Sequence, residues 1–253
     1  MRLKAFWAAL SAYSVIPVPQ YEWEDDITKY LICFFPAVGI IIGLLQCGWI
    51  FLCSVFLISP VLYAVVAAVL PLLISGGIHM DGFMDTVDAL ASHQSTERKL
   101  EIMKDSHCGA FAVIYCGVYI LLTLRLYHEL FVNGIAGAML PVFVLSRALS
   151  GLCAVNLPKA RKDGMLSSMT GNTDRKGAIL FLVLFAAAAC VVMALWGPVS
   201  GLGGILFAVF WTLQYRRLAM KNFGGVTGDT AGFFLQLCEL FALLGILVGG
   251  MLL

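Results

Sequence analysis

Three aspartates stand at helical spacing in residues 76–90, which read GGIHMDGFMDTVDAL. Asp81, Asp85 and Asp88 occupy positions i, i+4 and i+7, so a helix would hold their carboxylates within about 60° of its circumference. Like charges this close repel one another unless a cation lies between them, and oxygen ligands favour Mg²⁺ or Ca²⁺. We therefore predict a divalent metal site, with His79 beside it as a general base or phosphate contact. A solvated acidic face is the alternative interpretation.

The segment that follows, residues 97–107, carries further acids next to basic side chains. Asp105 could complete the metal site, and Lys104 could meet a phosphate group during the reaction. The same residues would also suit a plain surface helix held by ion pairs at i,i+3 and i,i+4 spacing. Both interpretations stay open at this point.

A third segment, residues 222–232 (NFGGVTGDTAG), is rich in glycine and precedes a long apolar run. Glycine lets the backbone approach an anion or a metal closely, so this loop is a candidate phosphate-binding turn. Asp229 is a further candidate metal ligand, and a simple turn between two helices is the alternative. The candidate substrate contacts in this loop are Asn222, Gly224, Gly225, Thr227 and Gly228.

Two charged residues fall within apolar runs, where an unpaired charge is costly. Glu239 shares a helical face with Asp229, and we expect it to have a metal or a basic group as its partner. Arg147 should face the interior of the bundle and pair with an acid or with a substrate phosphate. Both are therefore candidate site residues, Glu239 for metal and Arg147 for substrate.

The composition indicates the elements that must position these groups. The chain has 253 residues, of which 61% are hydrophobic and only 12% charged, and its mean hydropathy is +0.94. Soluble domains have about 25% charged residues, which disfavours a soluble enzyme, a disordered chain and a nucleic-acid binder. We predict an all-α, polytopic membrane bundle of about seven spans forming a single transmembrane catalytic domain, residues 1–253. The apolar runs are 31–57, 61–78, 109–126, 134–156, 178–197, 201–219 and 231–253.

Basic residues predict the orientation of this bundle. Fourteen of the sixteen lysines and arginines fall in residues 1–30, 79–108, 157–177 and 216–221, which seven spans place on one side. Positively charged loops face the cytoplasm, so we expect the N-terminus and the site there. Every acid except Glu129 belongs to that side. The first of these segments is predicted to hold a retained interfacial helix rather than a cleaved signal, and the second and third to be cytoplasmic loops with short helices.

Carboxylates from separate segments would therefore meet one membrane face, next to lysines, arginines and a glycine turn. A metal in such a site neutralises phosphate oxygens and the leaving group, while basic side chains hold the rest of a diphosphate. The combination predicts a Mg²⁺-dependent transfer of a phosphoryl-type group, in which an alcohol attacks a nucleotide diphosphate ester.

The same motifs resemble a known family. Residues 76–90, 100–111 (LEIMKDSHCGAF) and 222–240 (NFGGVTGDTAGFFLQLCEL) are similar to the signatures of adenosylcobinamide-GDP ribazoletransferase, also called cobalamin-5′-phosphate synthase. Residues 6–19 and 34–45 are similar to this family as well. The resemblance runs over nearly the whole chain, with the motifs in order.

The resemblance implies a membrane enzyme of the last steps of cobalamin biosynthesis, in the prokaryotic cytoplasmic (inner) membrane. The family joins adenosylcobinamide-GDP to α-ribazole or its 5′-phosphate, giving adenosylcobalamin or its 5′-phosphate plus GMP, and needs Mg²⁺. Our mechanistic hypothesis is that the ribazole 3′-hydroxyl attacks the cobinamide-side phosphate, with Mg²⁺ stabilising the departing GMP. The preferred ribazole form and self-association into a homo-oligomer stay open.

Carried onto this chain, the resemblance assigns roles to individual residues. It implies metal binding by an aspartate set with His79 beside it, a second acidic site at Asp229, and a phosphate-shaping glycine loop. The implied metal ligands are Asp81, Asp85, Asp88 and Asp105. Arg161, in the basic stretch after the fourth span, is the implied substrate contact there. The chain departs from the family pattern at Ala89, His107 and Gln236.

Two other functions fit parts of the sequence. A CDP-alcohol phosphotransferase also places aspartates on helices at the cytoplasmic edge, but its pattern has Ala-Arg where this chain has Met84-Asp85. A cation transporter would put ionisable residues near the membrane midplane, between broken or repeated helices. Nearly all acids lie at one edge here and no repeat is visible, so transport is the weaker alternative.

Overall fold

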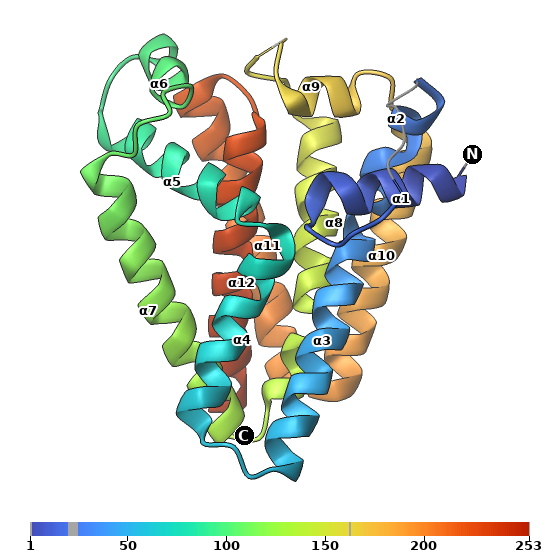
Figure 1. Cartoon of the computed structure of the whole chain (residues 1–253), viewed down its shortest axis with the longest axis vertical. Coiled ribbons are helices and arrows are strands. Elements are labelled where there is room, and N and C mark those ends of the chain that lie inside the picture. Colours follow the sequence, from blue (N-terminus) through green and yellow to red (C-terminus); the bar gives the residue numbers. More distant parts are fainter. Residues whose placement is uncertain (1, 20–24, 162, 253) are drawn as a thin grey trace.

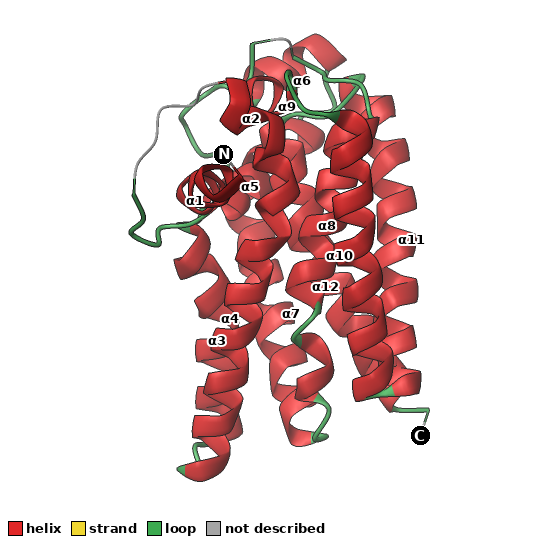
Figure 2. Cartoon of the chain, turned by 90° about the vertical axis from the view of Figure 1, so that its right-hand side faces the viewer, coloured by secondary structure: helices red, strands yellow, loops and turns green. Residues whose placement is uncertain are grey.

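A computed structural model describes residues 2–19, 25–161 and 163–252, and within these ranges the regular elements are all helices (Figures 1 and 2). The predicted all-α class is therefore confirmed, while residues 20–24 of the predicted interfacial segment lie outside the described residues. The helices are α1 (Arg2–Tyr13), α2 (Asp25–Leu31), α3 (Phe35–Val55), α4 (Pro60–Ser75), α5 (Ile78–Ala91), α6 (Thr96–Ile102), α7 (Ala110–Val132), α8 (Val142–Asn156), α9 (Met165–Thr170), α10 (Arg175–Trp196), α11 (Pro198–Phe223) and α12 (Gly228–Gly250), with short 3₁₀ turns at Ile32–Phe34 and Ala136–Met139.

The long helices match the predicted membrane spans. Within the described residues, six helical stretches are long and apolar enough to cross a membrane, and the bent pair α4 and α5 can count as a seventh. The six are Ile27–Val55, Ala110–Val132, Ala136–Asn156, Arg175–Trp196, Pro198–Phe223 and Gly228–Gly250. These are the predicted runs with boundaries shifted by a few residues.

The exception is the predicted span 61–78, which ends earlier and turns. α4 stops at Ser75, and α5 continues at 93° to it. Gly76 and Gly77 make this turn with φ of 63° and 78°, a backbone conformation that residues with a Cβ rarely adopt. Their N–H groups donate to Leu73 O and Leu72 O, which terminates α4. The aspartate helix therefore leaves the direction of the span.

The short helices gather at one end of the bundle. Figure 1 shows α2, α6 and α9 together at the top with the N-terminus nearby, while the C-terminus lies near the other end. Figure 2 shows α1 end-on, lying across the bundle rather than along it. α1 ends at Tyr13, within the segment predicted to hold an interfacial helix. The four basic segments therefore share one side, as the charge distribution predicted.

α12 is the central helix (Figure 1) and packs most extensively against α11 and α5. In its most apolar stretch 67% of the residues are buried, compared with 22% in α10, whose outer side chains are exposed. Peripheral helices of this kind present apolar side chains to lipid, whereas a buried helix needs small residues where its neighbours approach. α12 thereby forms a rigid support for the segment that precedes it.

Candidate active site

The aspartate helix α5 crosses the start of α12 at backbone contact distance. A Cβ added to Gly82 would lie 2.7 Å from Asp229 O, and one added to Gly232 would lie 2.8 Å from His79 O. Only hydrogen fits at either position, so glycine on both helices allows the crossing. It joins two sequence motifs that are far apart in the chain, and it explains how Asp229 reaches the aspartates of α5.

The crossing creates an acidic group of side chains around Asp85. Partial burial, together with the charges of Asp81, Asp229 and Asp88, raises the pKa of Asp85 to about 7, against the opposing effect of Arg161. Arg161 Nη1 lies 3.6 Å from Asp229 Oδ2. Carboxylates that raise one another's pKa in this way favour a bound cation. Asp81, Asp85 and Asp229 are therefore close enough to influence one another electrostatically.

Asp88 has a different local role. Its Oδ2 accepts a hydrogen bond from Gly109 N at 2.6 Å, and its Oδ1 accepts one from Ala112 N at 2.8 Å. These are N–H groups of the first turn of α7, which otherwise lack partners within the helix. Asp88 therefore fixes the start of α7 with both of its oxygens, and it contributes to the acidic group as a nearby charge.

The structure does not bring Asp105 and Lys104 into this group. Asp105 Oδ1 accepts from His107 N at 3.0 Å and lies 2.6 Å from His107 Nδ1. The Asp105 side chain is 58% exposed, and Lys104 is exposed beside it. Asp105 thus pairs with His107 and does not join the acidic group. The reason is that α6 ends at Ile102, so Asp105 is not held on a continuing helix.

The ligand chemistry fits Mg²⁺, although no cage of side chains is formed. In the described part of the chain, no three His, Cys, Asp or Glu side chains are close enough together to hold a metal ion by themselves. Mg²⁺ commonly keeps several waters and uses one or two carboxylates plus substrate phosphates, so it needs no such cage. Oxygen donors from Asp81, Asp85 and Asp229 are of the type that it prefers.

The predicted phosphate loop packs largely against protein. Gly224 ends α11 with φ of 69°, and Val226 pairs with the basic stretch through N–H to Pro158 O (2.8 Å) and O to Ala160 N (3.0 Å). Thr227 caps α12 by accepting from Thr230 N. A Cβ on Gly225 would clash with the backbone around Pro158. The glycines therefore let this loop dock and place Arg161 beside Asp229.

Asn222, a predicted substrate contact, is hydrogen-bonded within the protein. Its Oδ1 accepts from Lys99 Nζ at 2.8 Å, and its Nδ2 donates to Leu218 O. Lys99 is buried, so this contact fastens α6 to the end of α11. Lys99 was not among the predicted site residues, because in the sequence it is one more cation in a charged surface segment.

The two charged residues inside the bundle, Arg147 and Glu239, form an ion pair with one another. Arg147 Nη1 lies 2.7 Å from Glu239 Oε1, and Ser146 Oγ donates to the same oxygen at 3.1 Å. Both side chains are buried. The expectation that each has an oppositely charged partner is confirmed, but the partner is protein rather than metal or phosphate. Glu239 therefore stands apart from the acidic group as the structural partner of Arg147.

His79 is buried at the beginning of α5, next to the Phe35 ring. Its Nε2 is fully buried and has no hydrogen-bond partner. Burial, together with the nearby positive charge of Arg147, lowers the pKa of His79 to about 3. The imidazole is therefore neutral and a weak proton acceptor, which favours a binding role over the predicted role of general base.

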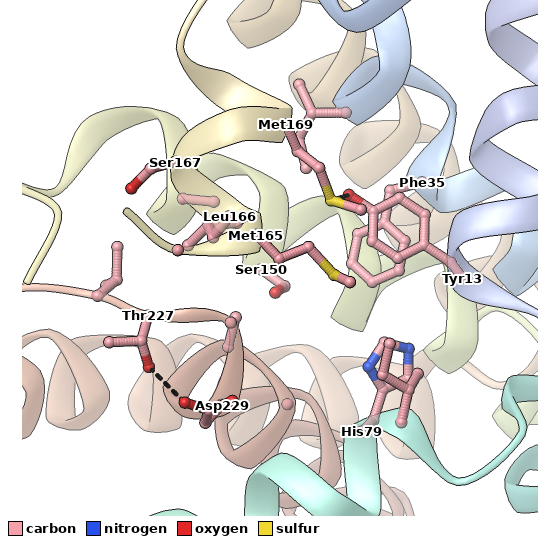
Figure 3. A pocket seen from close by; sticks show the side chains of 18 of the residues that line it. Tyr13, Phe35, His79, Ser150, Met165, Leu166, Ser167, Met169, Thr227 and Asp229 are labelled. Carbon is pink, nitrogen blue, oxygen red and sulfur yellow. Dashed lines mark hydrogen bonds between the residues drawn. The ribbon is translucent and has the colours of Figure 1, made fainter. Parts of the chain in front are cut away.

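His79 lines a pocket of about 400 Å³ (Figure 3), and Asp85, Asp88, Arg147 and Glu239 are not part of its lining. Asp81, Arg161, Thr227 and Asp229 lie on its polar side. In Figure 3, Asp229 and Thr227 lie on one side of the opening, and His79, Tyr13 and Phe35 lie on the other. Gln236, one of the departures from the family pattern, is outside the pocket lining and accepts from Tyr119 Oη at 2.5 Å.

The apolar part of the pocket lining was not predicted from the sequence. Tyr13 comes from α1, Phe35 from α3, and Met165 and Met169 from α9. Nothing distinguishes these residues from ordinary packing residues in an apolar chain. Only the folded arrangement of three separate helices over α5 brings them to the site.

Comparison with known proteins gives one consistent result. The profile of the family described as cobalamin-5-phosphate synthase matches residues 5–247. A relative from Lachnoclostridium phytofermentans, named adenosylcobinamide-GDP ribazoletransferase, is 40% identical over 251 residues, covering 97% of this chain and 94% of its own length. Relatives of the same name from Desulfitobacterium hafniense and Clostridium botulinum are 33% and 32% identical, over 96% and 95% of this chain and of their own lengths.

No solved structure is significantly similar to this chain. The sequence relatives extend over almost the full chain, including the aspartate helix, the glycine loop and the apolar lining of the pocket. The polytopic helical architecture agrees with the membrane enzyme that the sequence motifs suggested. The chain belongs to the cobalamin-5-phosphate synthase family.

Proposed function

We propose that this protein joins adenosylcobinamide-GDP to α-ribazole or α-ribazole 5′-phosphate, forming adenosylcobalamin or its 5′-phosphate and releasing GMP. We place the reaction at the cytoplasmic face of the prokaryotic inner membrane. Full-length relatives named for this activity support the proposal. The basic residues clustered at the site end of the bundle support the orientation.

The observation that carries the proposal is the pocket between α5, α9 and the start of α12. It combines carboxylates, an arginine and an apolar chamber in about 400 Å³, which suits a nucleoside meeting a diphosphate. α9 lines the pocket and lies at the same end of the bundle as α2 and α6 (Figure 1), so a large second substrate would approach from that end. Neither an ion pathway nor a purely structural role requires this combination.

The chain's own residues would act as follows. A ribose hydroxyl of the ribazole attacks the phosphorus on the cobinamide side of the diphosphate, and the bond from that phosphorus to the oxygen of GMP breaks. Asp81, an exposed carboxylate in the lining, accepts the proton of the attacking hydroxyl. Arg161, held beside Asp229 at 3.6 Å, binds phosphate oxygens, because a guanidinium matches their geometry.

We further propose that the reaction depends on Mg²⁺, held by Asp81, Asp85 and Asp229. When bound, the ion would neutralise the charge that develops on the phosphate oxygens and on the leaving GMP. Asp88 would keep the start of α7 in place beside these carboxylates through its bonds to Gly109 and Ala112.

The test is a reconstituted reaction. Purified protein in lipid vesicles is incubated with adenosylcobinamide-GDP, α-ribazole and Mg²⁺, and GMP and corrinoid products are quantified by chromatography. We expect one GMP per cobalamin formed, with loss of the reaction in EDTA and recovery on adding Mg²⁺. Absence of product where a relative of the same name is active would contradict the proposal, and release of CMP from a CDP-alcohol would favour the phosphotransferase alternative.

A further inference from the structure

The pocket has two chemically different ends. One end carries Asp81, Asp229 and Arg161, and the other is walled by rings and thioethers from α1, α3 and α9. Figure 3 shows the Tyr13 and Phe35 rings and the Met165 and Met169 side chains grouped above His79, away from Asp229. A ligand that fills the pocket must therefore be apolar at one end and polar at the other.

The apolar end holds one polar atom that is buried without a partner. His79 is 7% exposed, and its Nε2 makes no hydrogen bond within the protein. The nearby Tyr13 hydroxyl donates to Met169 Sδ at 3.4 Å. Leaving a buried nitrogen unsatisfied is costly, and such atoms usually mark a ligand or a water. Because His79 lines the pocket, this unpartnered nitrogen belongs to the wall of the apolar chamber and is a candidate contact for a ligand.

We propose that the apolar end of the pocket is the binding site for the base of the nucleoside acceptor, an apolar bicyclic aromatic ring, and that His79 Nε2 hydrogen-bonds to its free ring nitrogen. The inference rests on the proposed function, since α-ribazole carries such a base, dimethylbenzimidazole. The ring fills the space between Tyr13, Phe35 and Met169. Tyr and Phe rings and Met thioethers favour aromatic ligands.

The chamber selects against the other nucleoside in the reaction. Guanine presents several donors and acceptors on its edge, whereas the apolar end offers few partners beyond His79 and Tyr13. A polar edge buried without partners is strongly disfavoured, so guanine is expected to bind elsewhere. His79 is accordingly a specificity-determining residue that distinguishes the two nucleosides.

The position of the base also sets the position of the sugar. His79 and Asp81 are two residues apart on α5, and both line the pocket. Asp229 lies on the opposite side of the opening from His79 (Figure 3), so a base that contacts His79 would direct its ribose across the pocket toward Asp229. The apolar end would thus orient the attacking hydroxyl as well as recognise the base.

The test measures binding separately from turnover. Dissociation constants of the α-ribosides of dimethylbenzimidazole and of dimethylindole, in which C–H replaces the free ring nitrogen, are measured by titration calorimetry on the intact protein in nanodiscs. For the unaltered protein we expect the indole riboside to bind about tenfold more weakly, as for loss of one hydrogen bond. In His79→Ala the two should bind with equal affinity, while the affinity for adenosylcobinamide-GDP stays unchanged.

Three further variants or ligands complete the design. His79→Phe keeps a ring in the same place, and it replaces the alanine variant if that one is unstable. His128→Ala removes an imidazole that lies beside Glu129 on α7, outside the pocket lining, and should leave both constants unchanged. The benzimidazole riboside without its methyl groups should bind about fourfold more weakly per methyl removed.

The outcomes separate the two proposals. If the ratio of the two constants is the same in His79→Ala and in the unaltered protein, or if guanosine displaces α-ribazole with similar affinity, the base site is overturned. Failure of the unaltered protein to bind α-ribazole overturns it too. If the ratio changes as expected but no GMP is released in the complete reaction, the base site stands and the proposed activity is overturned.

Discussion

Gly82 lies so close to Asp229 that a Cβ at Gly82 would come within 2.7 Å of the Asp229 carbonyl oxygen. This contact fixes the crossing of α5 over the start of α12, and it brings carboxylates from two distant motifs to one pocket. Both members of the contact are backbone, so neither can rotate away to admit a larger side chain. The geometry of the acidic group therefore depends on the absence of one methyl group.

Replacing this glycine should separate the acids. We expect Gly82→Ala to lower the rate of GMP release by about tenfold or more, because displacement of about 1 Å at a reacting centre is that costly. Overpacking should also destabilise the protein by about 1–3 kcal/mol. Gly117→Ala on α7, where an added Cβ meets nothing within 4 Å, is the control and should keep full activity. Equal rates in both variants would show that the crossing does not position the site.

Substitution of different acidic residues should change the rate of GMP release to very different extents. Asp229→Asn should lower the Mg²⁺-dependent rate by about a hundredfold or more, because it removes one charge from a preorganised site. Asp105→Asn should change the rate less than about twofold, as exposed surface substitutions are generally mild. The measurement is the initial rate of GMP release against Mg²⁺ concentration. A large, Mg²⁺-reversible loss in Asp105→Asn would return that residue to the metal site.

Asp85 should make the stability of the metal-free protein depend on pH. In the folded protein its pKa is about 7, compared with 3.8 for a free aspartate, so the folded state holds a proton that the unfolded state has lost. Stability in EDTA should therefore fall as the pH rises from about 4 to about 7. Mg²⁺ should raise the thermal midpoint more at pH 8 than at pH 5. In Asp85→Asn this dependence should be much reduced; an unchanged profile would assign it to another group.

The pair formed by Arg147 and Glu239 should matter for stability. Arg147→Met leaves a buried, unpaired carboxylate and should cost about 3–5 kcal/mol, seen as a midpoint lower by about ten degrees in thermal unfolding. The double variant Arg147→Met/Glu239→Leu removes both charges and should recover most of this loss. If the double variant is as unstable as the single one, packing of the arginine, rather than its charge, is the main contribution.

Cys108 offers a natural probe of orientation. It is an exposed free cysteine in the loop before α7, at the same end as the site. A membrane-impermeant maleimide should label it in inverted membrane vesicles and leave it unlabelled in intact cells. Cys108→Ser should lose this labelling, since the other exposed cysteine, Cys47, lies within the α3 span. Labelling in intact cells would place the site outside the cytoplasm.

The sequence by itself determined the helical membrane class, the approximate spans and the side on which the charges gather. It also identified six acids as candidate metal ligands, Asp81, Asp85, Asp88, Asp105, Asp229 and Glu239, because helical spacing and scarcity of charge are local properties of the chain. It predicted oppositely charged partners for Arg147 and Glu239, since the cost of an unpaired charge in a membrane does not depend on the fold.

Only the tertiary structure decided which groups meet. The turn at Gly76–Gly77 redirects α5 across α12. Glu239 forms an ion pair with Arg147, and Asp105 pairs with His107 at the surface. Tyr13, Phe35 and Met169 gain a role only because α1, α3 and α9 close over His79. Partners of this kind depend on contacts between distant segments. Helical spacing reports which residues share a face, but it does not report what that face touches.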